Sequence, residues 1–255
     1  MHILKNTIKA SLVLLAALTL ITSPSLMAAN FKLDKTRIVF DEETRRDEIK
    51  IYNESNILQS YKVSIIEMEM TEEGSLVEIE SSQSSAAPFL RVGPRVSRDV
   101  KPYTFQKVRI IKKKSPKPGE YRSHLVVEAL AKEPVKQVSG VFIRPNIKYV
   151  IPIIIRQGVE KAELEFGTPN TTDDGMLELV LNRKGNTSIN GNIVVTDKND
   201  EEIYRANQVS VYQELVSRKL KTDLKKEDMA GQTLSLLFED PNNEDEVLVR
   251  QVVKM

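Results

Sequence analysis

The chain has 255 residues, and its 37 Lys and Arg against 36 Asp and Glu give a formal net charge of +1. Such a balanced chain lacks the strongly basic surface on which general nucleic-acid binders and membrane-surface binders depend. It contains no cysteine, which excludes a small scaffold stapled by disulfides. Its domains must therefore be held together by ordinary hydrophobic cores.

Residues 1–29 are predicted to be a secretory signal peptide. Lys5 and Lys9 precede the apolar run Leu12–Ile21, and small residues follow as far as Ala29. This order is typical of a signal that is removed on export. The run is short and lacks stop-transfer charges, so we expect no stable membrane insertion. The alternative interpretation is a buried N-terminal helix.

The remaining chain, about 226 residues, is long enough for two domains. Most segments alternate apolar and polar residues with a period of two, and turn residues interrupt them at short intervals. We predict an all-β protein with two immunoglobulin-like β-sandwich domains, 30–157 and 158–255. Strands are expected near 49–51, 61–65, 90–100, 106–112, 121–131, 139–158, 162–167, 176–182, 189–196, 202–211, 216–223, 234–238 and 247–253. Segment 212–230 is ambiguous, because its leucines also fit an amphipathic helix.

The longest apolar stretch outside the signal is Ser139–Gly158, and it carries Pro145 and Pro152. Proline removes a donor from the hydrogen-bond ladder, so a central strand accepts it poorly. We therefore predict an edge strand. A long apolar edge favours aggregation unless another chain docks on it.

Catalytic residues are scarce in this sequence. After the signal the only histidine is His124, which alternation places on an outer, polar face with Arg122 and Glu128. A metal cluster or a histidine-based triad needs more than one such residue. The sequence therefore predicts no enzyme active site, no metal site and no cofactor.

One charged residue is unexpected in its position. Arg37 begins the run Arg37–Phe40, which otherwise reads as an apolar strand. A guanidinium taken out of water needs an anion nearby. That anion could be internal, such as Asp34 or Asp41 or a residue on a neighbouring strand, or it could belong to another molecule.

The first domain resembles the periplasmic pilus-assembly chaperones of the chaperone-usher pathway, the PapD type. The resemblance is spread over about 120 residues in matching order, and it includes a Thr-Arg pair before an apolar run, an Asn-x-Ser strand exit and a Gln-x-x-Arg strand. These motifs lie in Asp34–Asp41, Ile49–Ser55, Val92–Val96, Gln106–Ile110 and Gly119–Ser123. The second domain resembles the family only in size and strand pattern.

The resemblance implies a chaperone in the periplasm whose partners are pilus or fimbrial subunits and an outer-membrane usher. Such chaperones lend an edge strand to subunits that lack their last strand, which is donor-strand complementation. Here that strand would be Val138–Ile155, with Val141, Ile143 and Ile147 pointing into the subunit groove. The alternative is that these side chains complete the chaperone's own core.

The family also anchors the subunit's C-terminal carboxylate between the two domains with an Arg and a Lys. Arg37 matches the Arg, but Pro152 occupies the place expected for the Lys. Lys148 lies four residues earlier and, with a period of two, on the same face. We therefore expect Lys148 to be the second anchor, with Arg156 as the alternative.

A rival interpretation is an exported two-domain adhesin or structural pilus component, and a secreted β-sandwich enzyme is a third. A pilus subunit should carry a donor segment at its mature N-terminus. Asn30–Lys32 is too short to be one. The chaperone interpretation is favoured for this reason.

Overall fold

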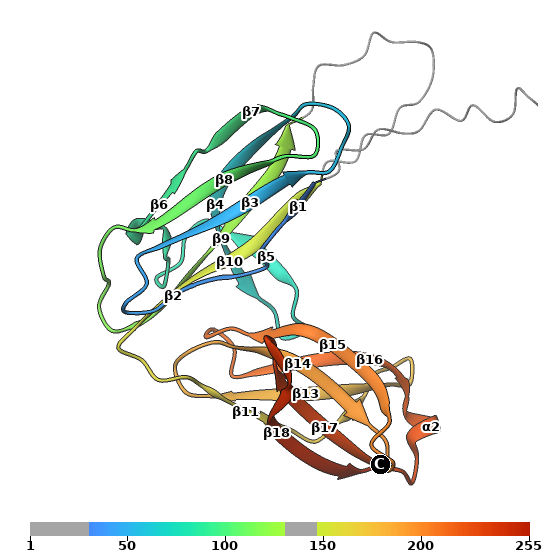
Figure 1. The fold of residues 1–255 in the computed structure, drawn as a ribbon. Helices are drawn as coiled ribbons and strands as arrows, with labels where there is room; N and C mark the ends of the chain where they lie inside the picture. The colour runs from blue at the N-terminus through green and yellow to red at the C-terminus, as the bar shows by residue number, and fades with distance from the viewer. Residues whose placement is uncertain (1–30, 131–146) are drawn as a thin grey trace, which may run out of the picture.

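The computed structural model describes residues 31–130 and 147–255. Its strands form two pairs of packed sheets, and the change from one pair to the other lies between Gln157 and Glu163 (Figure 1). The predicted all-β class with two β-sandwiches is therefore confirmed. Within the described residues, no helix has both the length and the apolar character needed to cross a bilayer.

The first sandwich contains two sheets that pack face to face. One has the order β1-β3-β8-β6 and the other has the order β2-β10-β9-β4-β5, with β7 also paired to β4. The strands are β1 (Phe31–Leu33), β2 (Ile38–Phe40), β3 (Arg46–Asn53), β4 (Gln59–Met70), β5 (Leu76–Ile79), β6 (Leu90–Gly93), β7 (Val96–Val100), β8 (Phe105–Lys112), β9 (Gly119–Leu130) and β10 (Lys148–Gln157).

Alternation along these strands builds the first core. Ile49 and Ile51 from β3 meet Leu125 and Val127 from β9, and all four are fully buried. The single strand predicted over 90–100 is divided into β6 and β7, which pair with different sheets. The break falls at Pro94, which has no N–H for a ladder.

The second sandwich also contains two sheets. In one of them β13 pairs with β11, β12 and β16, and the other has the strand order β15-β14-β17-β18. Its elements are β11 (Glu163–Phe166), β12 (Asn170–Thr171), β13 (Met176–Lys184), β14 (Ile189–Thr196), β15 (Glu202–Val211), β16 (Ser217–Lys225), α2 (Lys226–Met229), β17 (Thr233–Asp240) and β18 (Asn243–Lys254). The ambiguous segment 212–230 thus contains the strand β16 followed by one helical turn.

The predicted edge strand is an edge over only part of its described length. β10 pairs with β9 from Lys148 to Gln157, and β2 pairs in parallel with Ile153–Ile155 on the other side. Ile154 packs with Met70 of β4 and is also covered by Tyr212 of the second sandwich. The Ile153–Ile155 half of the strand is therefore enclosed, which corrects the simple edge assignment.

Candidate interdomain binding site

Arg37 immediately precedes β2 and lies where the two sandwiches meet. Its Nη2 donates hydrogen bonds to Asn190 Oδ1 on β14 at 3.0 Å and to Ser210 Oγ on β15 at 2.6 Å. The guanidinium carbon lies 5.8 Å from the ring centre of Tyr212. All three partners belong to the second sandwich, and none is an anion.

No carboxylate of the described residues lies within 4 Å of the Arg37 guanidinium. Asp34 instead accepts a hydrogen bond from the backbone N–H of Lys50, and Asp41 accepts those of Glu43 and Thr44. Burial lowers the pKa of Arg37, and the nearby Arg156 and Arg122 lower it further. An internal ion pair with Asp34 or Asp41 is therefore wrong, and Arg37 is a desolvated cation, since arginine remains protonated in proteins.

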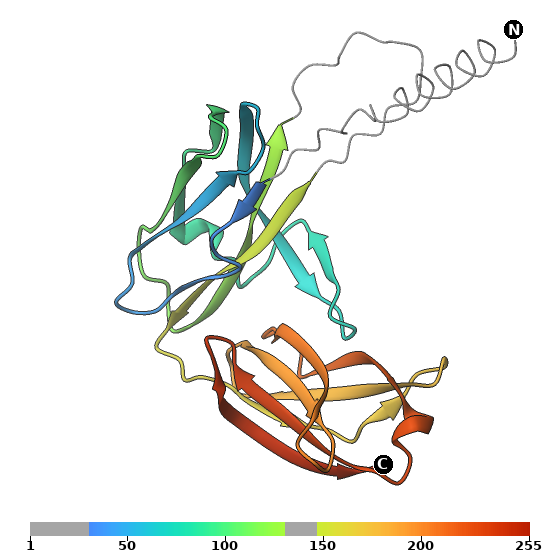
Figure 2. The ribbon, with the colours of Figure 1, turned by 45° about the vertical axis from the view of Figure 1, so that its right-hand side comes forward.

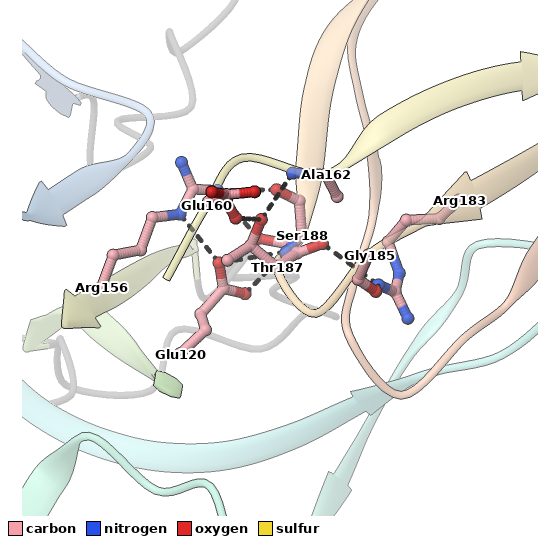
Figure 3. A network of polar contacts seen from close by, with 8 residues as sticks. All are labelled: Glu120, Arg156, Glu160, Ala162, Arg183, Gly185, Thr187 and Ser188. Carbon is pink, nitrogen blue, oxygen red and sulfur yellow. Dashed lines mark hydrogen bonds and ion pairs between the residues drawn. The ribbon is translucent and has the colours of Figure 1, made fainter. Parts of the chain in front are cut away.

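Arg156, at the end of β10, is held by a polar network across the domain boundary (Figure 3). Its Nε donates to Glu120 Oε2 at 2.9 Å, and its Nη2 donates to the carbonyl oxygen of Ser188 at 2.6 Å. The Ser188 N–H donates to both Glu120 oxygens at 3.0 Å. The Glu120 side chain is fully buried, so this carboxylate requires Arg156 and Ser188 together.

The loop that carries Ser188 is itself fixed to the linker between the sandwiches. Thr187 Oγ1 accepts a hydrogen bond from the Ala162 N–H at 2.8 Å and donates one to the Glu160 carbonyl at 3.0 Å (Figure 3). Arg183 contacts the Gly185 carbonyl oxygen in the same loop. Glu120 therefore meets a preformed backbone donor.

A third guanidinium, that of Arg122 on β9, is paired with Glu214. Its two terminal nitrogens donate to the two Glu214 oxygens at 2.9 and 2.7 Å. The guanidinium lies 3.8 Å from the ring centre of Tyr212. Burial opposes ionisation of Glu214, but the hydrogen bonds and charge of Arg122 outweigh it and lower the Glu214 pKa.

These groups leave a local excess of positive charge. Arg37, Arg122 and Arg156 supply three guanidiniums, whereas Glu120 and Glu214 supply two carboxylates. A cavity of about 560 Å³ is lined by Arg37 and Arg156 and by the apolar side chains of Ile189, Phe238 and Leu248; its other charged lining residues are Asp34, Lys35, Lys161 and Asp240. The arrangement can accept an anionic group near apolar side chains.

The structure does not bring Lys148 to this site. Lys148 lies opposite Glu128 on β9 and forms a 3.5 Å ion pair with it. It is five residues from Ile153, the partner of Ile38, and five residues of strand span about 17 Å. Lys148 lies on the predicted face of β10, but at the end of the strand that is distant from Arg37. Arg156, at the other end, is the cation that lines the same cavity as Arg37.

Of the three predicted donor-strand residues, Val141 and Ile143 lie outside the described residues. Ile147 is half-buried and packs against the first core. Tyr149, on the same face, stacks edge-on against Phe31 with ring centres 4.9 Å apart. The donor role of all three residues stays a prediction.

The expectation for His124 was wrong. It does share a face with Arg122, but that face is covered by the second sandwich, and His124 is 0% exposed. Its ring lies 6.1 Å from that of Tyr212, and neither ring nitrogen has a hydrogen-bond partner among the described residues. Burial, with a smaller effect of Arg122, lowers the pKa of His124 to about 4.

Sequence reasoning identified Arg37 and missed its surroundings. Asn190, Ser210, Tyr212 and Glu214 come from the second sandwich, more than 150 residues from Arg37. Glu120 gave one signal, a carboxylate at the start of a strand that goes on into the apolar run Leu125–Val127. The pairing itself depends on how the two sandwiches meet, which periodicity does not encode.

No protein-family model matches the sequence, and no curated protein matches it significantly. Solved structures do match. The chain is similar to a structure of the CsuC–CsuE chaperone–tip adhesion subunit pre-assembly complex from archaic chaperone-usher Csu pili of Acinetobacter baumannii. The TM-score is 0.53 and the identity 13%, with 89% of this chain and 98% of that chain covered.

Two other structures have similar values. One is the Salmonella enterica SafA pilin in complex with the SafB chaperone, with a TM-score of 0.53, 13% identity, and coverage of 89% of this chain and 97% of that chain. The other is the E. coli chaperone DraB, with a TM-score of 0.51, 12% identity, and coverage of 89% and 98%. The chain therefore has the two-sandwich fold of the chaperones in chaperone-usher pilus systems, which confirms the resemblance at the level of fold.

Proposed function

We propose that this chain is a periplasmic chaperone that binds pilus or fimbrial subunits by donor-strand complementation and delivers them to an outer-membrane usher. The observation that carries the proposal is the position of Arg37. It is a desolvated guanidinium without a carboxylate partner among the described residues, and it lies at one end of an open strand edge.

The geometry of β10 supports this role. Between Lys148 and Pro152 the strand has β9 on one side and no paired strand, within the described residues, on the other. From Ile153 onward β2 occupies that second side. A subunit strand added to the open edge, and running parallel to β10, would have to end where β2 begins. Its terminal carboxylate would then meet Arg37.

The hydrogen bonding of Arg37 leaves room for that carboxylate. Among the described residues only Nη2 has hydrogen-bond partners, which leaves Nε and Nη1 as donors for a ligand. Arg122 and Arg156 are each paired with a carboxylate, whereas Arg37 is not, so the charge of Arg37 is available to an anionic ligand. A charge-assisted bond of this kind is worth about 1.5–3 kcal/mol.

The donor segment would supply the remaining affinity. In this proposal Val141, Ile143 and Ile147 fill the groove of the subunit. Each aliphatic side chain that is fully buried contributes about 1.5–3 kcal/mol. The carboxylate at Arg37 would set the register of the added strand, since it fixes one end.

The test is capture of subunits from the periplasm by a tagged chain, followed by mass spectrometry. We expect short exported subunits, whose genes encode signal peptides, with the wild-type chain, and their loss with Arg37→Met. Arg109→Met is the matched control, since it removes an exposed arginine of β8 that lines neither the interdomain cavity nor the open edge of β10. Capture of the same subunits by Arg37→Met at wild-type yield would contradict the proposal.

A further inference from the structure

The hairpin formed by β4 and β5 leaves the first sandwich and reaches the second one (Figure 2). At its tip, the Lys219 N–H on β16 donates a hydrogen bond to the Glu72 carbonyl oxygen at 2.7 Å. The Lys219 and Glu72 side chains are 3.6 Å apart. A Cβ added at Gly74 would lie only 2.2 Å from the guanidinium of Arg218, so the tip packs closely against β16.

Glu214 lies at the base of this contact and is held entirely by the first sandwich. Besides the two bonds from Arg122, it accepts a hydrogen bond from the Met70 N–H at 2.8 Å. Arg122 Nη2 also donates to the Met68 carbonyl oxygen at 2.9 Å. One carboxylate of the second sandwich is thereby joined to two strands of the first, β4 and β9.

An apolar cluster surrounds the ion pair. Met70 and Ile154 from the first sandwich pack with Tyr212 and Leu215 from the second. Tyr212 also lies beneath the Arg122 guanidinium. Excluding water from an ion pair strengthens its geometric restraint, although it adds little net stability because both charges lose their hydration.

This contact and the Arg37 site share one short segment of chain. Ser210, which accepts a hydrogen bond from Arg37, is two residues before Tyr212 and four before Glu214. Arg218, beneath the hairpin tip, donates a hydrogen bond to the Ser210 carbonyl oxygen at 2.5 Å. The contacts that hold Glu214 in place therefore also hold Ser210 opposite Arg37.

A second interdomain contact lies near the linker, where Glu120 binds Ser188. A contact beside a linker leaves the distant parts of two bodies free to swing about it. The hairpin contact adds a separate point of attachment, between β16 and the tip of the hairpin. Two separated attachments define the angle between the sandwiches.

We infer that Glu214 is a positioning residue for the Arg37 site and that the β4–β5 hairpin is a strut that sets the interdomain angle. The strut holds Ser210 and Asn190 against Arg37 before any ligand arrives. This inference goes beyond the proposed function, and its test needs no subunit, so the two can fail separately.

The test uses the absence of natural cysteine. Arg109→Cys on β8 and Val252→Cys on β18 place two spin labels at exposed positions in different sandwiches. Pulsed electron spin resonance then measures the distribution of distances between them. We expect Glu214→Gln to broaden this distribution and shift its mean, because the amide has one acceptor oxygen in place of two and its NH2 group faces a guanidinium donor, which weakens the attachment to Arg122 on β9.

The matched control is Glu239→Gln. Glu239 is likewise a glutamate paired with an arginine, at 2.9 Å from Arg205, but both residues belong to the second sandwich, and its side chain is more buried than that of Glu214. We expect the wild-type distribution for this variant. The double variant Arg122→Gln/Glu214→Gln leaves no unpaired buried charge, so it folds even where the single variant does not. A wild-type distance distribution in the folded double variant would overturn the inference.

Discussion

Arg37 differs from its two neighbouring guanidiniums in the partners that it has. Arg122 binds Glu214 and Arg156 binds Glu120, so each has a carboxylate, whereas Arg37 donates only to neutral oxygens among the described residues. A desolvated charge without a counter-ion costs stability. The position of Arg37 is therefore better explained by binding than by folding.

Truncation of Arg156 and truncation of Lys148 are expected to change the free energy of unfolding by different amounts. Arg156→Ala leaves the fully buried Glu120 carboxylate without its cation, and loss of one partner of a buried pair costs about 3–5 kcal/mol. Lys148→Ala removes a largely exposed pair, which changes stability by less than about 1 kcal/mol. Chemical denaturation of both variants measures this difference. Equal losses would mean that Arg156 is not part of the interdomain framework.

His124 predicts a pH dependence of stability. Its pKa is about 4 in the folded chain, against about 6.5 when unfolded, so the unfolded state binds more protons between these values. Stability is therefore fully present above pH 6.5 and falls as the pH decreases toward 4, by about 3 kcal/mol in total. Below pH 4 both states are protonated, and this contribution changes no further.

The measurement is urea denaturation from pH 4 to pH 7 for the wild-type chain and for His124→Phe. The phenylalanine keeps a buried ring beside Tyr212 and cannot titrate. We expect a shallower pH profile for this variant over the same range. Identical profiles would show that His124 is not the titrating group.

At the scale of elements, the ten residues of β10 contact three neighbours. It pairs with β9 throughout, with β2 over Ile153–Ile155, and it covers the second sandwich with Ile154. The predicted edge strand is confirmed for Lys148–Pro152, which has β9 as its only partner strand among the described residues. Proline and a continuous apolar run, the two features behind this prediction, are both visible in the sequence. The parallel pairing with β2 was not predicted, since a three-residue strand has too little periodicity to reveal its partner.

Proline scanning of β10 tests the open edge. Pro152 is tolerated in the ladder, which indicates that its backbone nitrogen faces away from β9. With a period of two, the Val150 N–H faces the same way, whereas the Ile151 N–H faces β9. We expect Val150→Pro to fold normally and to lose subunit capture, because the added strand loses a donor. Ile151→Pro should instead destabilise the first sandwich, as measured by thermal unfolding.

Normal capture by Val150→Pro would contradict strand addition at this edge. Both variants place proline in β10, at neighbouring positions. A difference between them in stability or in subunit capture therefore shows which way the lost backbone N–H pointed. A general effect of proline on β10 would affect both equally.

At the scale of the whole molecule, the two sandwiches were predictable and their junction was not. Strand periodicity located nearly all of the strands, because each sandwich buries one face of every sheet. The junction depends on polar contacts between residues far apart in sequence, such as Arg122 with Glu214. His124 was misplaced for the same reason, since a polar face in the strand pattern became an interface. Lys148 was assigned to the correct face and the wrong end of the strand.

The central claim is that Arg37 binds the terminal carboxylate of a subunit. A thermodynamic cycle tests it most directly, with the wild-type chain and Arg37→Met each titrated with one captured subunit and with the same subunit extended beyond its natural C-terminus. We predict that Arg37→Met lowers affinity for the natural subunit by about tenfold to a hundredfold. We also predict that the loss disappears with the extended subunit, because its carboxylate no longer reaches the site. An equal loss with both subunits would contradict the account.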